Sequence, residues 1–177
     1  MSRMILCSVS IVAAATVPIG TASRYNLGHP ATAGETKACD ISVAPDGVGL
    51  PEGSGTALQG RAVYEAQCAI CHGARGEGNA DYPALVGGRG TLNTDEAVLT
   101  VGSYWPYATT VWDYIHRAMP YRNPGSLTPN EVYSVTAYVL FMNGIVGLRD
   151  QVTAKSLPTV KMPNRDGFVP DPRPDVK

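Results

Sequence analysis

Apolar side chains recur at helical spacing between residues 56 and 148, which predicts a compact helical domain there. The clearest pattern lies near the end of this region. One helical face is apolar and consists of Val132, Val135, Val139 and Met142. Thr128, Pro129 and Glu131 precede this face as an N-cap, a first-turn proline and a capping-box acid. We therefore predict a helix that begins after Thr128 and stops before Gly144.

Earlier stretches of the same region also predict helices. Residues 57–69 carry apolar positions at helical spacing, and Gly60 lies one turn before Tyr64 on a face that another helix can cross closely. Residues 109–118 form a further apolar helix that stops at a proline. Its apolar face consists of Val111, Trp112, Ile115 and Met119. A short helix is expected to start at residues 93–96, where a hydroxyl cap precedes two acids. The fold class is therefore all-α.

Both flanking regions lack this periodicity. Glycine and proline interrupt residues 23–55 too often for a helix or strand, so we expect an irregular N-terminal arm. Residues 149–177 combine repeated prolines with mixed charges, which predicts an extended, Pro-rich C-terminal tail. Cys39 stands alone in the N-terminal arm, and we expect it to be a small buried apolar side chain.

The first 22 residues predict a signal peptide. A brief positive start at Arg3 leads into an apolar run that ends near Val17, and Gly20 to Ala22 offers small residues for cleavage. The run is shorter than the roughly 20 apolar residues that a membrane span needs. We therefore expect export to the periplasm and no stable membrane span after cleavage, with an uncleaved anchor as the alternative.

The charge of the chain argues against one class of partner. The 177 residues carry a formal net charge of -1 and show no basic stripe, so the sequence gives no reason to expect a nucleic-acid partner.

The sequence Cys68-Ala69-Ile70-Cys71-His72 carries the chemistry. Two thiols at this spacing can bind the two vinyl groups of one porphyrin, and the following histidine can supply a proximal imidazole to the iron. The alternatives are a thioredoxin-like pair or half of a zinc site. A thioredoxin motif requires a βαβ pattern that is absent, and a zinc site requires a second ligand pair that Cys7 and Cys39 do not provide. We therefore predict one covalent haem c.

A second axial ligand must come from elsewhere in the chain. The candidates are His29, His116, Met119, Met142 and Met162. Met142 belongs to an apolar helical face, and His29 and Met162 lie in the arms. Met119 is favoured over His116 because it ends its helix at Pro120, where a thioether can reach the iron without breaking helical hydrogen bonds. A His72/Met119 pair fills both axial positions, which suits outer-sphere electron transfer rather than substrate binding.

Several stretches of the sequence resemble a known family. The stretches at 60–64, 68–73, 82–85 and 118–120 together resemble a class I cytochrome c, a small helical haem domain. The block from Gly102 to Pro120, with Ser126 to Thr128 and the helix that follows, resembles more narrowly the SoxD-type cytochrome subunit of sulfane and sulfite dehydrogenases. The resemblance covers about residues 27–170.

The resemblance implies a role and further site residues. A molybdenum-cofactor dehydrogenase subunit on a separate chain would oxidise sulfite or sulfane sulfur, so this chain would not be an enzyme by itself. Its haem would accept electrons singly and pass them to a soluble cytochrome. The carbonyl of Pro83 would orient the proximal imidazole, and Arg89, Tyr104 and Trp105 are candidates for contacts with the haem propionates. Two alternatives stay open: a free-standing periplasmic electron shuttle, and a haem enzyme or sensor with an open axial position.

Overall fold

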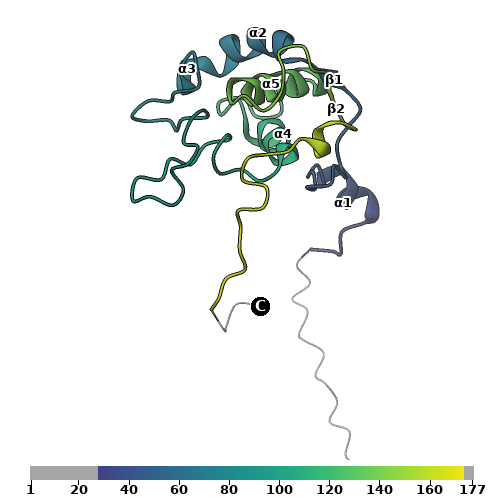
Figure 1. Cartoon of the computed structure of the whole chain (residues 1–177). Helices are drawn as coiled ribbons and strands as arrows, with labels where there is room; N and C mark the ends of the chain where they lie inside the picture. Colours follow the sequence, from purple (N-terminus) through teal and green to yellow (C-terminus); the bar gives the residue numbers. More distant parts are fainter. Residues whose placement is uncertain (1–27, 174–177) are drawn as a thin grey trace, which may run out of the picture.

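The computed structural model describes residues 28–173 and shows a helical molecule with one small sheet (Figure 1). The signal-peptide prediction lies outside the described residues. In chain order the elements are α1 (Ala33–Cys39), β1 (Ser54–Gly55), α2 (Ala57–Gln67), α3 (Ala69–His72), α4 (Ala108–Ala118), α5 (Pro129–Met142), β2 (Val152–Thr153) and the 3-10 helix η1 (Leu157–Thr159). Among residues 28–173, no helix has the length and apolar character needed to cross a membrane.

Helix α5 is the centre of the fold and lies between α2 and α4 (Figure 1). Its start follows the prediction, because the Thr128 side chain accepts from the Glu131 backbone and the Glu131 carboxylate accepts from the Thr128 backbone. Every residue from Val132 to Leu140 is buried. A helix that is buried on all sides belongs to a core, so α5 is more enclosed than one apolar face indicates.

Helices α2 and α5 cross in direct backbone contact. A Cβ added at Gly60 would lie 1.9 Å from the carbonyl oxygen of Ser134 and 2.9 Å from Cβ of Tyr138. Only a glycine allows this approach, which confirms the close crossing predicted from Gly60 and Tyr64. Because α2 leads directly into α3, this crossing also fixes the position of the Cys68 to His72 motif.

The two arms are more ordered than their composition indicates. The N-terminal arm forms α1 and β1, and β1 pairs antiparallel with β2 of the tail in the register Ser54 to Thr153 and Gly55 to Val152. Leu157 is fully buried and Met162 is 3% exposed, so the tail contributes to the core as far as residue 162. The tail has little secondary structure, as expected, and its first half covers the helical domain because apolar side chains between the prolines pack against the helices.

The N-terminal arm is tied to the helices by polar contacts. The Val43 backbone donates to the Asp113 carboxylate of α4 at 2.9 Å. The Tyr133 hydroxyl of α5 donates to the Pro51 carbonyl at 2.8 Å. Asp113 also pairs with Arg117, one turn later on α4. These side chains satisfy backbone groups of an arm that has little secondary structure of its own.

Two local predictions are wrong. Cys39 is exposed, because α1 buries no residue and stands away from the core (Figure 1). No helix forms at residues 93–96, where the chain makes turns. The hydroxyl of Thr94 donates to the Thr91 carbonyl at 2.7 Å, and the Thr91 hydroxyl accepts from Val98 N–H at 3.0 Å. Such local side-chain bonds compete with a helix for the backbone.

Candidate functional site

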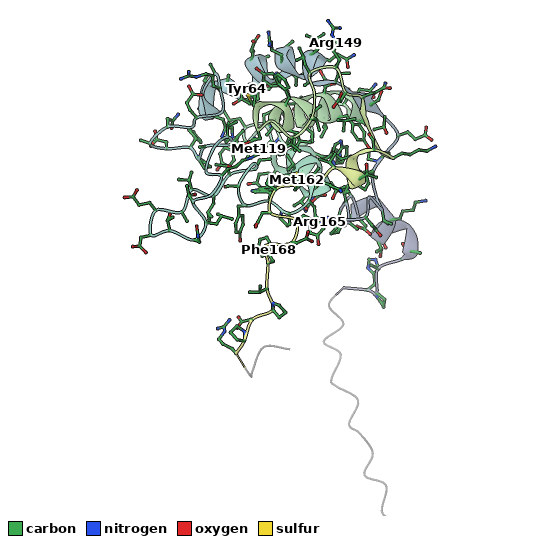
Figure 2. All side chains as sticks on the ribbon, in the orientation of Figure 1. Tyr64, Met119, Arg149, Met162, Arg165 and Phe168 are labelled. Carbon is green, nitrogen blue, oxygen red and sulfur yellow. The ribbon has the colours of Figure 1, made fainter. Side chains whose placement is uncertain are left out.

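A cavity of about 390 Å³ opens beside α3, between α2, α4 and the loops that connect them. Four residues that the sequence singles out line it together: Cys68, Cys71, His72 and Met119. Much of the remaining lining is aromatic or aliphatic and includes Tyr64, Leu85, Val101, Trp105, Ile115 and Leu127. Tyr64 and Met119, labelled in Figure 2, approach the cavity from α2 and from the end of α4. This enclosure suits a large, flat, apolar group.

The single turn of α3 arranges the motif. The backbone N–H groups of Cys71 and His72 both bond to the Cys68 carbonyl, at 3.1 and 3.0 Å. This turn brings Cys68, Cys71 and His72 to the cavity, whereas Ile70 between them is 85% exposed. Gly73 ends the turn at a φ of +80°, a backbone conformation that residues other than glycine rarely adopt. The spacing of the motif therefore matches the shape of one helical turn.

The environment of Cys68 favours the neutral thiol over the thiolate. Burial, and secondarily the neighbouring Cys71, raises the pKa of Cys68 to about 11. Redox-active cysteine pairs usually lower the pKa of one thiol, and the burial of Cys68 acts in the opposite direction. Within the described part of the chain, no cluster of three or more His, Cys, Asp or Glu side chains could hold a metal ion. The thioredoxin and zinc alternatives therefore lack support.

The orientation of His72 is fixed by one contact. Its Nδ1 lies 3.0 Å from the carbonyl oxygen of Pro83. A carbonyl oxygen only accepts, so Nδ1 carries the proton and Nε2 keeps the lone pair that can bind a metal. This is the contact that the resemblance implies for Pro83. It sets both the tautomer and the plane of the imidazole.

The structure distinguishes between Met119 and His116, the two ligand candidates from this part of the chain. Met119 follows α4 as its C-cap with extended backbone, and it lines the cavity. His116 is not among the lining residues. Its ring packs on Trp112 with centroids 4.8 Å apart, and its buried Nδ1 has no hydrogen-bond partner. Of the two candidates on α4, the geometry therefore favours Met119 as the second axial ligand.

The remaining ligand candidates lie elsewhere. None of His29, Met142 and Met162 lines the cavity. His29 is exposed and lies near Glu35, whereas Met162 is buried where the tail meets the core.

Of the three propionate candidates, only Trp105 lines the cavity. Tyr104 is 39% exposed, and its ring meets Phe168 edge-on with centroids 5.3 Å apart. Arg89 is exposed and donates to the carbonyl of Asn143 at 2.6 Å. The structure therefore does not bring Arg89 and Tyr104 into the cavity, because each already has a partner elsewhere.

Several lining residues were not identified as site residues from the sequence. Tyr64 is buried, its hydroxyl donates to the Gly73 carbonyl at 2.8 Å, and burial raises its pKa. Val111 and Ile115 belong to the predicted apolar face of α4, a pattern that does not distinguish a core from a cavity wall. Tyr121 lies in a loop, and no local sequence signal indicates its position at the cavity.

Comparisons with known proteins agree with this geometry. The cytochrome c family model matches residues 57–143. Among solved structures, the sulfane dehydrogenase SoxCD from Paracoccus pantotrophus matches at 42% identity and a TM-score of 0.77, over 85% of this chain and 74% of that chain. The thiosulfate dehydrogenase TsdBA from Marichromatium purpuratum matches at 30% identity and a TM-score of 0.37, over 48% of this chain and 17% of that chain. A search of the curated proteins gives no match. With its helical fold and its Cys68 to His72 motif, the chain belongs to the cytochrome c family as a SoxD-like class I cytochrome c.

Proposed function

We propose that this chain is a periplasmic, mono-haem c-type cytochrome that serves as the electron-transfer subunit of a molybdenum-dependent dehydrogenase. The dehydrogenase would act on sulfite or sulfane sulfur, and the cytochrome would pass electrons one at a time to a soluble cytochrome. One observation carries the proposal: Cys68, Cys71, His72 and Met119 line a single, largely apolar cavity. This set would supply two points of covalent attachment and two axial ligands to a haem.

The residues present fit a haem. Cys68 and Cys71 would hold it through thioethers, and His72 Nε2 and the Met119 sulfur would bind the iron. When bound, haem supplies a one-electron couple, and a thioether ligand raises its reduction potential. A haem held in this way would have side chains at both axial positions and no position open for a substrate. This argues for an electron carrier and against a haem enzyme or sensor.

The protein contributes placement and environment. Apolar walls such as Val101 and Leu127 exclude water, which affects the reduction potential through the local dielectric. Pro83 holds the His72 ring in one orientation. We assign the substrate chemistry to another chain, and the match to the structure of the sulfane dehydrogenase SoxCD supports this assignment. A free electron shuttle would need no such partner.

Axial ligation is tested with a matched pair of methionine variants. The oxidised haem protein should show the weak sulfur-to-iron charge-transfer band in the far red. Met119→Leu should lose this band, because Met119 lines the cavity. Met162→Leu should keep it, because Met162 is buried in the core outside the cavity. A band that survives in Met119→Leu would rule out this ligand.

The role as a subunit is tested with the purified chain. Alone it should not turn over sulfite or thiosulfate, because no axial position is open. Addition of the cognate molybdenum subunit and substrate should reduce the haem rapidly. Steady turnover by the single chain would establish the enzyme alternative instead, and reduction that needs no stable complex would favour the free shuttle.

A further inference from the structure

Asn143, the C-cap residue of α5, connects that helix to a distant loop. The residue is buried, with 9% of its surface exposed. The side-chain nitrogen donates to the Val139 carbonyl at 2.9 Å, one turn back in α5, and to the Leu85 carbonyl at 3.0 Å. An amide nitrogen has two hydrogens, so both are used. The first bond fixes the side chain on α5, and the second holds a segment 58 residues away in sequence.

The segment that Asn143 holds is the one that orients His72. Leu85 lies two residues after Pro83, whose carbonyl accepts from His72 Nδ1. The backbone N–H of Leu85 donates to the Gly76 carbonyl at 2.8 Å. Leu85 is therefore fixed through its N–H by the loop itself and through its carbonyl by Asn143. With these bonds in place, the nearby Pro83 carbonyl cannot shift freely relative to the imidazole.

Two further contacts hold Asn143 in one position. A Cβ added at Gly102 would lie 2.0 Å from Asn143 Oδ1, so the amide packs directly against the backbone there. Arg89 donates to the Asn143 carbonyl at 2.6 Å. The first contact confines the side-chain amide on the side of Gly102, and the second holds the backbone of Asn143 in place. Asn143 acts as a rigid bridge between the core helix and the loop.

We propose that Asn143 is a positioning residue for His72 that lowers the reduction potential of the haem. It keeps Leu85 in place and so preserves the bond from His72 Nδ1 to Pro83. When Nδ1 of an imidazole donates a hydrogen bond, the other ring nitrogen becomes a more basic ligand, and a more basic ligand favours the oxidised iron. Loss of the bridge should weaken that bond and raise the potential. The inference rests on the haem-binding part of the proposed function.

The test compares two perturbing variants with one control. Asn143→Leu removes both donors without adding charge. Gly102→Ala keeps Asn143 but displaces its amide, and the backbone at Gly102 does not have a positive φ that would exclude alanine. The control is Asn130→Leu, which removes the acceptor for Ser54 N–H at the opposite end of α5. Each purified haem protein is titrated spectroelectrochemically, and its urea midpoint is measured in parallel.

Asn143→Leu and Gly102→Ala should both raise the potential, with a change on the order of tenfold in the reduction equilibrium, a scale typical of residues that support metal ligands. Asn130→Leu should lose stability without this shift. An unchanged potential in the perturbing variants, with stability lost, would overturn the proposal and leave Asn143 as a helix cap only. If Asn143→Leu does not fold, Gly102→Ala decides the question. A wild-type chain without a covalent haem spectrum would instead contradict the proposed function.

Discussion

Replacement of Gly60 by alanine is a sharp test of the fold, because helix propensity and tertiary packing predict opposite signs for the change in stability. In an isolated helix, alanine is more favourable than glycine by roughly 0.8–1 kcal/mol, so propensity alone predicts a more stable α2. In the folded protein the added carbon would lie 1.9 Å from the Ser134 carbonyl oxygen and 2.4 Å from its carbonyl carbon. Contacts below 3.0 Å essentially never occur for a real Cβ, so something must move.

The size of the effect follows from what must move. The nearest atoms are backbone atoms of the buried helix α5, which cannot swing aside as the end of a flexible side chain can. Overpacking of a core typically costs about 1–3 kcal/mol and occasionally more, and a backbone clash belongs at the upper end. After the gain in propensity is subtracted, we expect Gly60→Ala to lower the free energy of unfolding by about 2 kcal/mol.

The assay is urea unfolding of the haem protein, followed by far-UV circular dichroism. The midpoint should fall with little change in slope, as expected when stability changes and the unfolded state does not. Gly34→Ala is the matched control, because a Cβ there meets only Thr32 Oγ1 at 3.9 Å and α1 buries no residue. It should not lower the midpoint. A Gly60→Ala protein as stable as the wild type would refute the close α2–α5 crossing.

Two further predictions concern the tail and the capping of α5. Leu157→Ala should lower the free energy of unfolding by about 2–5 kcal/mol, because the side chain is fully buried, whereas Val169→Ala, 83% exposed in the same tail, should change it by less than about 0.5 kcal/mol. Equal urea midpoints would show that the tail is not part of the core. Hydrogen bonds from Thr128 hold the pKa of Glu131 below its ordinary value of 4.5, so the stability they add is present above that pH and is lost as the pH falls through the folded pKa. Glu131→Gln should therefore flatten the acid limb of the stability curve, and an unaltered limb would contradict this.

The sequence by itself determined the features that depend on neighbours within one or two turns of the chain. The start of α5 was predicted from Thr128, Pro129 and Glu131 because a capping box is complete within four residues. The arrangement of Cys68 to His72 follows from the geometry of a single helical turn. The glycine at position 60 indicated a close crossing, although not which helix would make it.

Only the tertiary structure decided which residues face one another across long separations. The bond from Val43 to Asp113 spans 70 residues, and the bond from Asn143 to Leu85 spans 58, and neither has a local signal. The same holds for Arg89. The resemblance made it a candidate for the haem propionates, but in the structure it donates to the carbonyl of Asn143 at the C-terminal end of α5. Burial is a property of the assembled core. Leu157, among prolines in a region of mixed charge, became core because the helices offered an apolar surface, whereas Cys39 remained exposed because α1 buries no residue.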